Sequence, residues 1–167
     1  MTRFKLAILM GIVLLLAGCK SSVNFEPVEV KYDRDMCKRC VMAVSDRLHS
    51  AQVVDPKTGE HFFFDDMGCA LLWLEEQNFD WKDDAIVYFT DGNDGSWIDG
   101  KKAVLAREFI TPMSFGIAAF KDKNSVPEGK EFVTYEQAKE IFLAIKAERV
   151  KNKEHGKMHQ QNKGNME

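Results

Sequence analysis

Short strand-like segments separated by turn residues run through most of this 167-residue chain, and they limit what it can fold into. Residues 51–54 and 61–64 are rich in valine and phenylalanine, and Asp55-Pro56-Lys57-Thr58-Gly59 between them is typical of a hairpin turn. Residues 28–32 alternate apolar and polar and also predict a strand. Strands this short need a covering layer, so we expect helices packed on them.

Two segments have the spacing of amphipathic helices. The first covers about residues 66–77, with Asp65 before it as a cap and Cys69, Leu72 and Trp73 on one face. The second follows the capping-box pattern that begins at Thr134, and we expect it to end near Val150. Short strands with helices packed on one side of them predict an α+β fold.

The second half of the chain repeats this order weakly. Strands are predicted at 85–89, 102–106 and 116–120, ahead of the second helix. When the two halves of the sequence are aligned at an offset of about seventy residues, Met42 lies opposite Met113. This offset is longer than the repeat length of solenoid proteins. If the halves pack about a pseudo-twofold axis, these two thioethers approach one another beside Cys40. The alternative is that Met113 simply fills the core.

The N-terminus has the pattern of an export signal. Arg3 and Lys5 precede an apolar run over 6–16, which is short for a membrane span, and Leu16-Ala17-Gly18-Cys19 resembles a bacterial lipobox. By that resemblance, residues 1–18 are a signal peptide, Cys19 carries acyl chains, and 19–27 form a tether. An ordinary signal or a membrane anchor is the alternative. We expect the body on the periplasmic face of a bacterial membrane, and Lys20 favours the outer membrane.

Composition argues against several functions. The chain carries 23 Lys and Arg against 26 Asp and Glu, a net charge of −3, which argues against nucleic acid as a partner. We find no Ser/His/Asp arrangement and no phosphate-binding glycine loop, so we do not expect an enzyme. We expect one small domain or two subdomains over 28–80 and 81–150, then a disordered polar tail over 151–167.

The sulfur-containing residues carry the functional hypothesis. With Cys19 assigned to lipid, Cys37, Cys40 and Cys69 remain, and an odd number is a poor disulfide framework. Cys37-Lys38-Arg39-Cys40-Val41-Met42 combines two thiols and a thioether, soft donors that favour Cu(I). A redox dithiol, half of a zinc site or a plain disulfide would have the same Cys-x-x-Cys spacing. Cys69, near a helix start, is either an acidified thiol or buried packing.

Several motifs together resemble the family of the nitrous oxide reductase accessory protein NosL. The resemblance covers nearly all of the chain from Cys19 to about Val150. It rests on the lipobox, Cys37-Lys38-Arg39-Cys40-Val41-Met42, Ala51-Gln52-Val53-Val54, Phe64-Asp65-Asp66-Met67-Gly68-Cys69 and Thr111-Pro112-Met113. It implies two similar ββαβ-type subdomains, and a lipid-anchored protein that delivers Cu(I) to a copper enzyme, above all to the copper-sulfide centre of nitrous oxide reductase.

The resemblance also assigns roles to residues. It implies Cys40 and Met113 as the main Cu(I) ligands and Met42 as the next, with Cys37 as an extra ligand or disulfide partner. Cys69 and Asp65 would then lie beside the ligands and support them. Val41 stands where the family has glycine, and valine resists positive φ. A periplasmic thiol-disulfide protein using Cys37 and Cys40 stays open as the alternative function.

Overall fold

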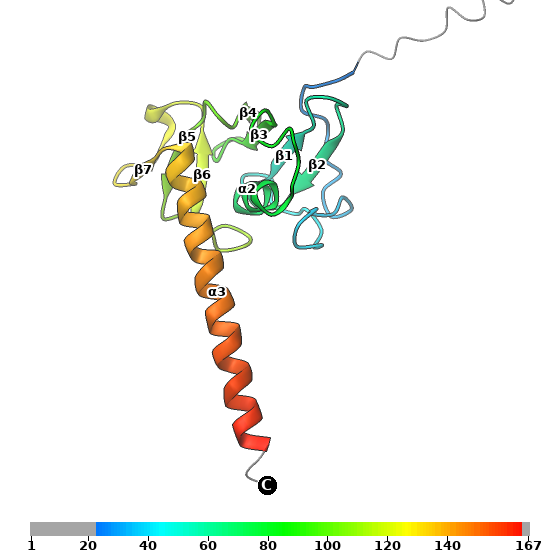
Figure 1. Cartoon of the computed structure of the whole chain (residues 1–167). Helices are drawn as coiled ribbons and strands as arrows, with labels where there is room; N and C mark the ends of the chain where they lie inside the picture. Colours follow the sequence, from blue (N-terminus) through cyan, green and yellow to red (C-terminus); the bar gives the residue numbers. More distant parts are fainter. Residues whose placement is uncertain (1–22, 165–167) are drawn as a thin grey trace, which may run out of the picture.

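The computed structural model describes residues 23–164, with side chains described as far as residue 155. Within that range it contains two antiparallel sheets, two α-helices and the short 3-10 helix η1, Lys123–Ser125 (Figure 1). The fold is therefore of the α+β class, as the sequence predicts.

The first sheet is formed around the predicted hairpin. Its strands, in spatial order, are β2 (His61–Phe64), β1 (Ala51–Val54), β3 (Ile86–Thr90) and β4 (Trp97–Asp99). In the turn between β1 and β2, the Asp55 carboxylate accepts hydrogen bonds from the backbone N–H groups of Lys57 and Thr58. Gly59 then takes a φ of 71°, which glycine adopts without strain. The hairpin prediction is confirmed.

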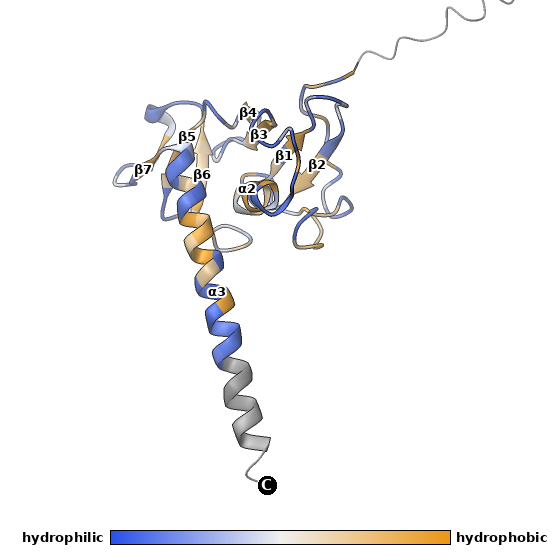
Figure 2. Ribbon diagram, in the orientation of Figure 1, coloured by the Kyte–Doolittle hydropathy of each residue, from blue (hydrophilic) through white to orange (hydrophobic). Residues whose placement is uncertain are grey.

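Helix α2 (Met67–Glu76) lies at the centre of the molecule (Figure 1). Asp66 caps it rather than the expected Asp65, because the Asp66 side chain accepts a hydrogen bond from the Gly68 N–H. Every residue from Met67 to Leu74 is buried, so the helix is covered on all sides rather than on one stripe. Figure 2 shows this mostly apolar helix enclosed by the chain.

The second sheet lies beside the C-terminal helix. It has the order β6 (Ile117–Phe120), β5 (Val104–Arg107), β7 (Phe132–Val133). The predicted capping box opens α3 (Tyr135–Gly164): Thr134 Oγ1 accepts from the Gln137 N–H, and Gln137 Oε1 accepts from the Thr134 N–H. Ala138 and Phe142 are fully buried against the body. Beyond them α3 projects outward and becomes hydrophilic (Figures 1 and 2).

The division between the sheets differs from the boundary expected at residues 80 and 81. Strand β3 pairs with β1, so the first sheet draws strands from both sides of that point. The sheets instead divide between β4 and β5. They remain linked, because the Gly92 N–H donates to the Ala119 carbonyl at 2.8 Å, and one apolar core spans both halves.

Two further expectations need correction. Residues 28–32 form no strand, because the buried Gln52 side chain pairs with both the N–H and the carbonyl of Val28. This amide takes the place of a strand ladder at that point. Helix α3 also continues to Gly164, so residues 151–164 are helical rather than a loose tail.

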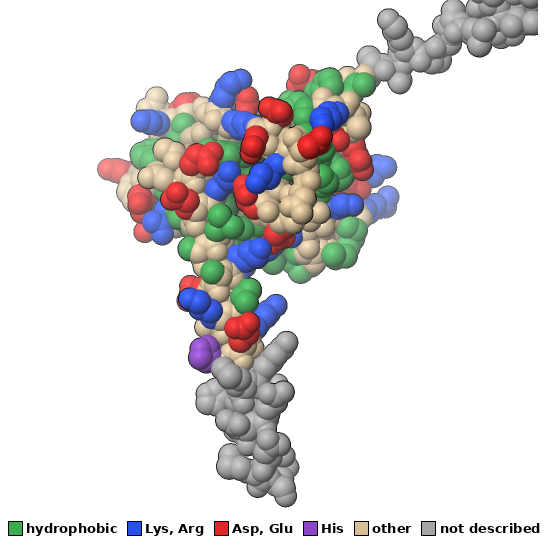
Figure 3. Space-filling view, viewed as in Figure 1, with side chains coloured by type: hydrophobic (Ala, Val, Ile, Leu, Met, Phe, Trp, Pro, Cys, Tyr) green, Lys and Arg blue, Asp and Glu red, His purple; other side chains and the backbone are tan. Residues whose placement is uncertain are grey.

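The predicted signal peptide and Cys19 lie outside the described residues. In the part of the chain that is described, no helix has the length and apolar character needed to cross a membrane. Acidic and basic side chains are interspersed over the visible face of the body (Figure 3).

Candidate metal centre

Three thiols from two distant segments meet at one point. Cys37 and Cys40 come from the loop before β1, and Cys69 comes from the first turn of α2. All three sulfur atoms lie within 4.8 Å of one another, and all three cysteines are free. Cys37 and Cys69 are buried, whereas Cys40 is half-buried. The three thiols could therefore hold a metal ion.

The loop that carries Cys37 and Cys40 is closed by its own backbone. The Cys37 N–H donates to the Met42 carbonyl at 2.8 Å, and the Val41 N–H donates to the Cys37 carbonyl at 2.9 Å. A third bond from the Lys38 N–H to the Phe63 carbonyl attaches the loop to β2. Val41 takes a φ of 59°, the conformation that glycine would accept more readily. The turn is therefore held in a fixed shape around the two thiols.

Hydrogen bonds within the cluster make Cys37 the most acidic thiol. Donation from the Cys69 thiol is the largest cause, and backbone N–H groups of Cys40 and Asp65 add to it, so that the pKa of Cys37 falls to about 5 despite burial. The pKa of Cys69 is raised by its bond to Cys37 and by burial, and burial raises the pKa of Cys40. Near neutral pH the cluster therefore holds one thiolate and two thiols.

This assignment makes a prediction for the Cys69→Ala variant. Alanine removes the strongest donor to Cys37, so the apparent pKa of the first thiolate should rise from about 5. Ultraviolet thiolate absorbance, followed through a pH titration of the reduced protein, measures it. Cys69→Ser is the matched control, because a hydroxyl still donates and should keep the transition closer to its original pH. An acidic transition that is the same in Cys69→Ala as in the unchanged protein would contradict the assignment.

Arg39 lies at the edge of the cluster. Its guanidinium binds both carboxylate oxygens of Glu76 on α2, at 2.8 to 3.2 Å. Lys38 instead lies over the Phe62 ring, 5.7 Å from its centroid. Of the two cations between the cysteines, Arg39 is thus the one bound to α2, the helix that carries Cys69.

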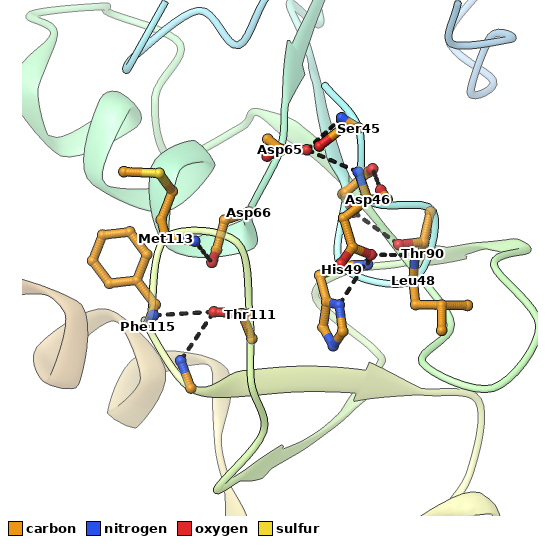
Figure 4. Close-up of polar contacts among 12 residues, drawn as sticks. Ser45, Asp46, Leu48, His49, Asp65, Asp66, Thr90, Thr111, Met113 and Phe115 are labelled. Atoms are coloured by element: carbon orange, nitrogen blue, oxygen red, sulfur yellow. Dashed lines mark hydrogen bonds and ion pairs between the residues drawn. The ribbon is translucent and has the colours of Figure 1, made fainter. Parts of the chain in front are cut away.

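The predicted methionine ligands lie in different surroundings. Met42 is 45% exposed on the loop that carries Cys40. Met113 is half-buried, and its backbone N–H donates to the Asp66 carboxylate at 3.1 Å (Figure 4). The Met113 side chain lines a groove of about 260 Å³ that Arg39 and Leu72 also line. Because Leu72 follows Cys69 by nearly one helical turn, Met113 borders the same face of α2 as Cys69.

Asp65 supports the cluster through its backbone. Its backbone N–H helps to lower the pKa of Cys37, while its buried carboxylate accepts from the N–H groups of Ser45 and Asp46 at 2.6 and 3.0 Å. These bonds hold the chain between β2 and α2 against the segment that follows the thiol loop.

Sequence reasoning treated Cys69 as a neighbour of the ligands rather than a member of the cluster. The available signal was the odd number of cysteines, since a third thiol at a helix start needs a partner. The spacing of Cys37 and Cys40 could not show that α2 begins opposite their loop, because that contact depends on the β1–β2 hairpin between them.

Comparison with known proteins identified no family and no similar curated protein. No family model matches the chain, and no curated protein matches its sequence. The site itself defines a class, a protein with a three-cysteine cluster that could bind a metal.

Proposed function

We propose that this chain is a Cu(I)-binding accessory protein that delivers copper to a copper enzyme. The observation that carries the proposal is the convergence of Cys37, Cys40 and Cys69 within 4.8 Å. Thiolates select soft ions, and Cu(I) is the softest of the common biological metals. Cys37 supplies a ready thiolate at neutral pH, as metal binding requires.

Copper is favoured over zinc by the kind and number of donors. Structural zinc sites have four ligands, nearly always nitrogen or charged sulfur. Here three thiols converge, and Met113 lines a groove beside Leu72 of α2. Its neutral thioether would suit Cu(I) better than Zn²⁺. The half-buried position of Cys40 leaves the cluster open to a ligand from another protein.

The recipient and the location are inferred from the family resemblance. The lipobox-like ending at Cys19 supports a lipid anchor on the periplasmic face of a bacterial membrane, with the outer membrane favoured. The motifs around Cys40, Asp65 and Met113 support membership of the NosL family and nitrous oxide reductase as the recipient. The same resemblance supports a relationship between the two halves as ββαβ-type repeats.

A thiol-disulfide protein is the second candidate, because a thiol with a pKa of about 5 next to Cys40 has the character of a redox cysteine. In that function Cys37 and Cys40 would form a reversible disulfide. Catalysed reduction of a disulfide substrate, without tight Cu(I) binding, would favour it.

An anaerobic Cu(I) competition titration of the reduced chain tests the copper proposal. We expect one tightly bound Cu(I) per chain. Replacing Cys37, Cys40 or Cys69 with serine should weaken Cu(I) binding by more than roughly 10- to 100-fold. That range is the usual loss of metal affinity when a residue that only supports a ligand is replaced. Met113→Leu should weaken binding less, because the thiolates remain.

Met36→Leu is the matched control, because Met36 is a half-exposed methionine at the base of the same loop. It should leave the affinity unchanged. Absence of Cu(I) binding by the unchanged chain, or cysteine variants that behave like Met36→Leu, would refute the proposal.

A further inference from the structure

Asp66 joins the helix that carries Cys69 to the loop that carries Met113. Its side chain has no solvent exposure, and its two oxygens serve different elements. Oδ1 accepts from the Gly68 N–H at 2.8 Å and caps α2, while Oδ2 accepts from the Met113 N–H at 3.1 Å. Figure 4 shows the carboxylate between these two parts of the chain.

The loop that carries Met113 is closed by a second side chain. The Thr111 hydroxyl oxygen accepts from the N–H groups of Phe115 and Gly116 at 3.0 and 3.2 Å (Figure 4). Met113 thus lies in a loop that Thr111 closes and that Asp66 attaches to α2.

Packing reinforces this attachment. The Phe115 ring lies directly over Gly68, where even a Cβ atom would come within 2.3 Å of it. The Arg149 guanidinium lies over the Phe115 ring, 4.6 Å from its centroid, and donates a hydrogen bond to the Met113 carbonyl at 2.8 Å. The Met113 backbone is therefore held at its N–H by Asp66 and at its carbonyl by Arg149.

We infer that Asp66 is a positioning residue that determines whether the Met113 thioether can join the thiol cluster. The inference rests on the proposed Cu(I) function. Asp66 has no need to touch the metal itself, since it sets the position of the Met113 backbone relative to the helix turn that presents Cys69. This couples a donor from the second half of the chain to thiols of the first.

Asp66→Asn separates this role from helix capping. Asparagine caps helices as well as aspartate does, but it has one acceptor oxygen in place of two. If the single amide oxygen accepts from the Gly68 N–H, the Met113 N–H has no acceptor on this side chain. Asp55→Asn is the matched control, because Asp55 is a buried carboxylate in the β1–β2 turn and one of its oxygens accepts both of its backbone hydrogen bonds.

The test is a double-mutant cycle read by Cu(I) affinity. We expect Asp66→Asn to weaken binding by roughly tenfold, the scale of losses at groups that orient ligands. The same change in a Met113→Leu background should have little effect, because the thioether is already absent. Asp55→Asn should leave the affinity close to that of the unchanged chain.

A spectroscopic measurement provides the second readout. In protein labelled with selenomethionine and carrying Met42→Leu, copper X-ray absorption should detect selenium bound to Cu(I), and Asp66→Asn should reduce that signal. An equal loss of affinity with and without Met113, or an unchanged selenium signal, would overturn the inference while leaving Cu(I) binding intact. If the unchanged chain binds no Cu(I), the proposed function falls and this inference with it.

Discussion

Replacing Phe142 with alanine is expected to lower the free energy of unfolding by about 3–5 kcal/mol, the usual cost of emptying a buried aromatic site. Phe142 is fully buried on α3 and meets the Phe115 ring edge-on, with centroids 5.2 Å apart. Alanine would remove this contact and leave a cavity between α3 and α2. Urea unfolding measures the change as a lower midpoint with a similar slope.

The adjacent Leu143 provides the control for that experiment. It lies on the same helix but is 42% exposed, so Leu143→Ala should change stability by no more than about 1 kcal/mol. Equal losses for the two variants would mean that α3 does not pack on the body through Phe142.

A second large effect is expected for Gly68→Ala. Alanine is the better helix former, so helix propensity alone would make this change stabilising by up to about 1 kcal/mol. The new Cβ would instead lie 2.3 to 2.9 Å from Phe115, including its Cβ, which is too close for a rotation of the ring to relieve. We expect a net loss of about 2–3 kcal/mol in the free energy of unfolding, within the range for overpacked cores.

A compensating substitution tests the cause of this loss. Phe115→Leu shortens the side chain over Gly68, so the double variant should be more stable than the sum of the two single changes implies. Strictly additive losses, or a stabilised Gly68→Ala variant, would contradict the close approach of the 111–116 loop to α2. Because that loop carries Met113, Gly68→Ala should also weaken Cu(I) binding.

Local patterns were sufficient for much of the fold. The β1–β2 hairpin, the starts of both helices and the capping box at Thr134 depend on residues close in sequence, and all were predicted. The segment at 28–32 has strand-like alternation, yet the Gln52 side chain satisfies the backbone of Val28 instead. A side chain distant in sequence that replaces a neighbouring strand in this way cannot be detected from the alternation of apolar and polar residues.

The candidate site was predictable only in part for the same reason. The soft-donor character of Cys37 and Cys40 could be recognised from composition and spacing. The membership of Cys69 depends on the packing of α2 against the thiol loop, and the connection of Asp66 to Met113 joins residues 47 positions apart. Sequence reasoning placed the cap of this helix at Asp65, one residue before Asp66, which caps it with one of its two oxygens.

The unequal exposure of the three thiols has a consequence for the order in which bonds to a metal form and break. Cys37 and Cys69 are closed off from solvent, and Cys40 alone of the cluster is half-open. An incoming ion would meet Cys40 first, and a competing ligand from a receiving protein would displace Cys40 before the two buried sulfurs. Exchange rates should therefore respond most to changes at Cys40, even where equilibrium affinity depends on all three thiols.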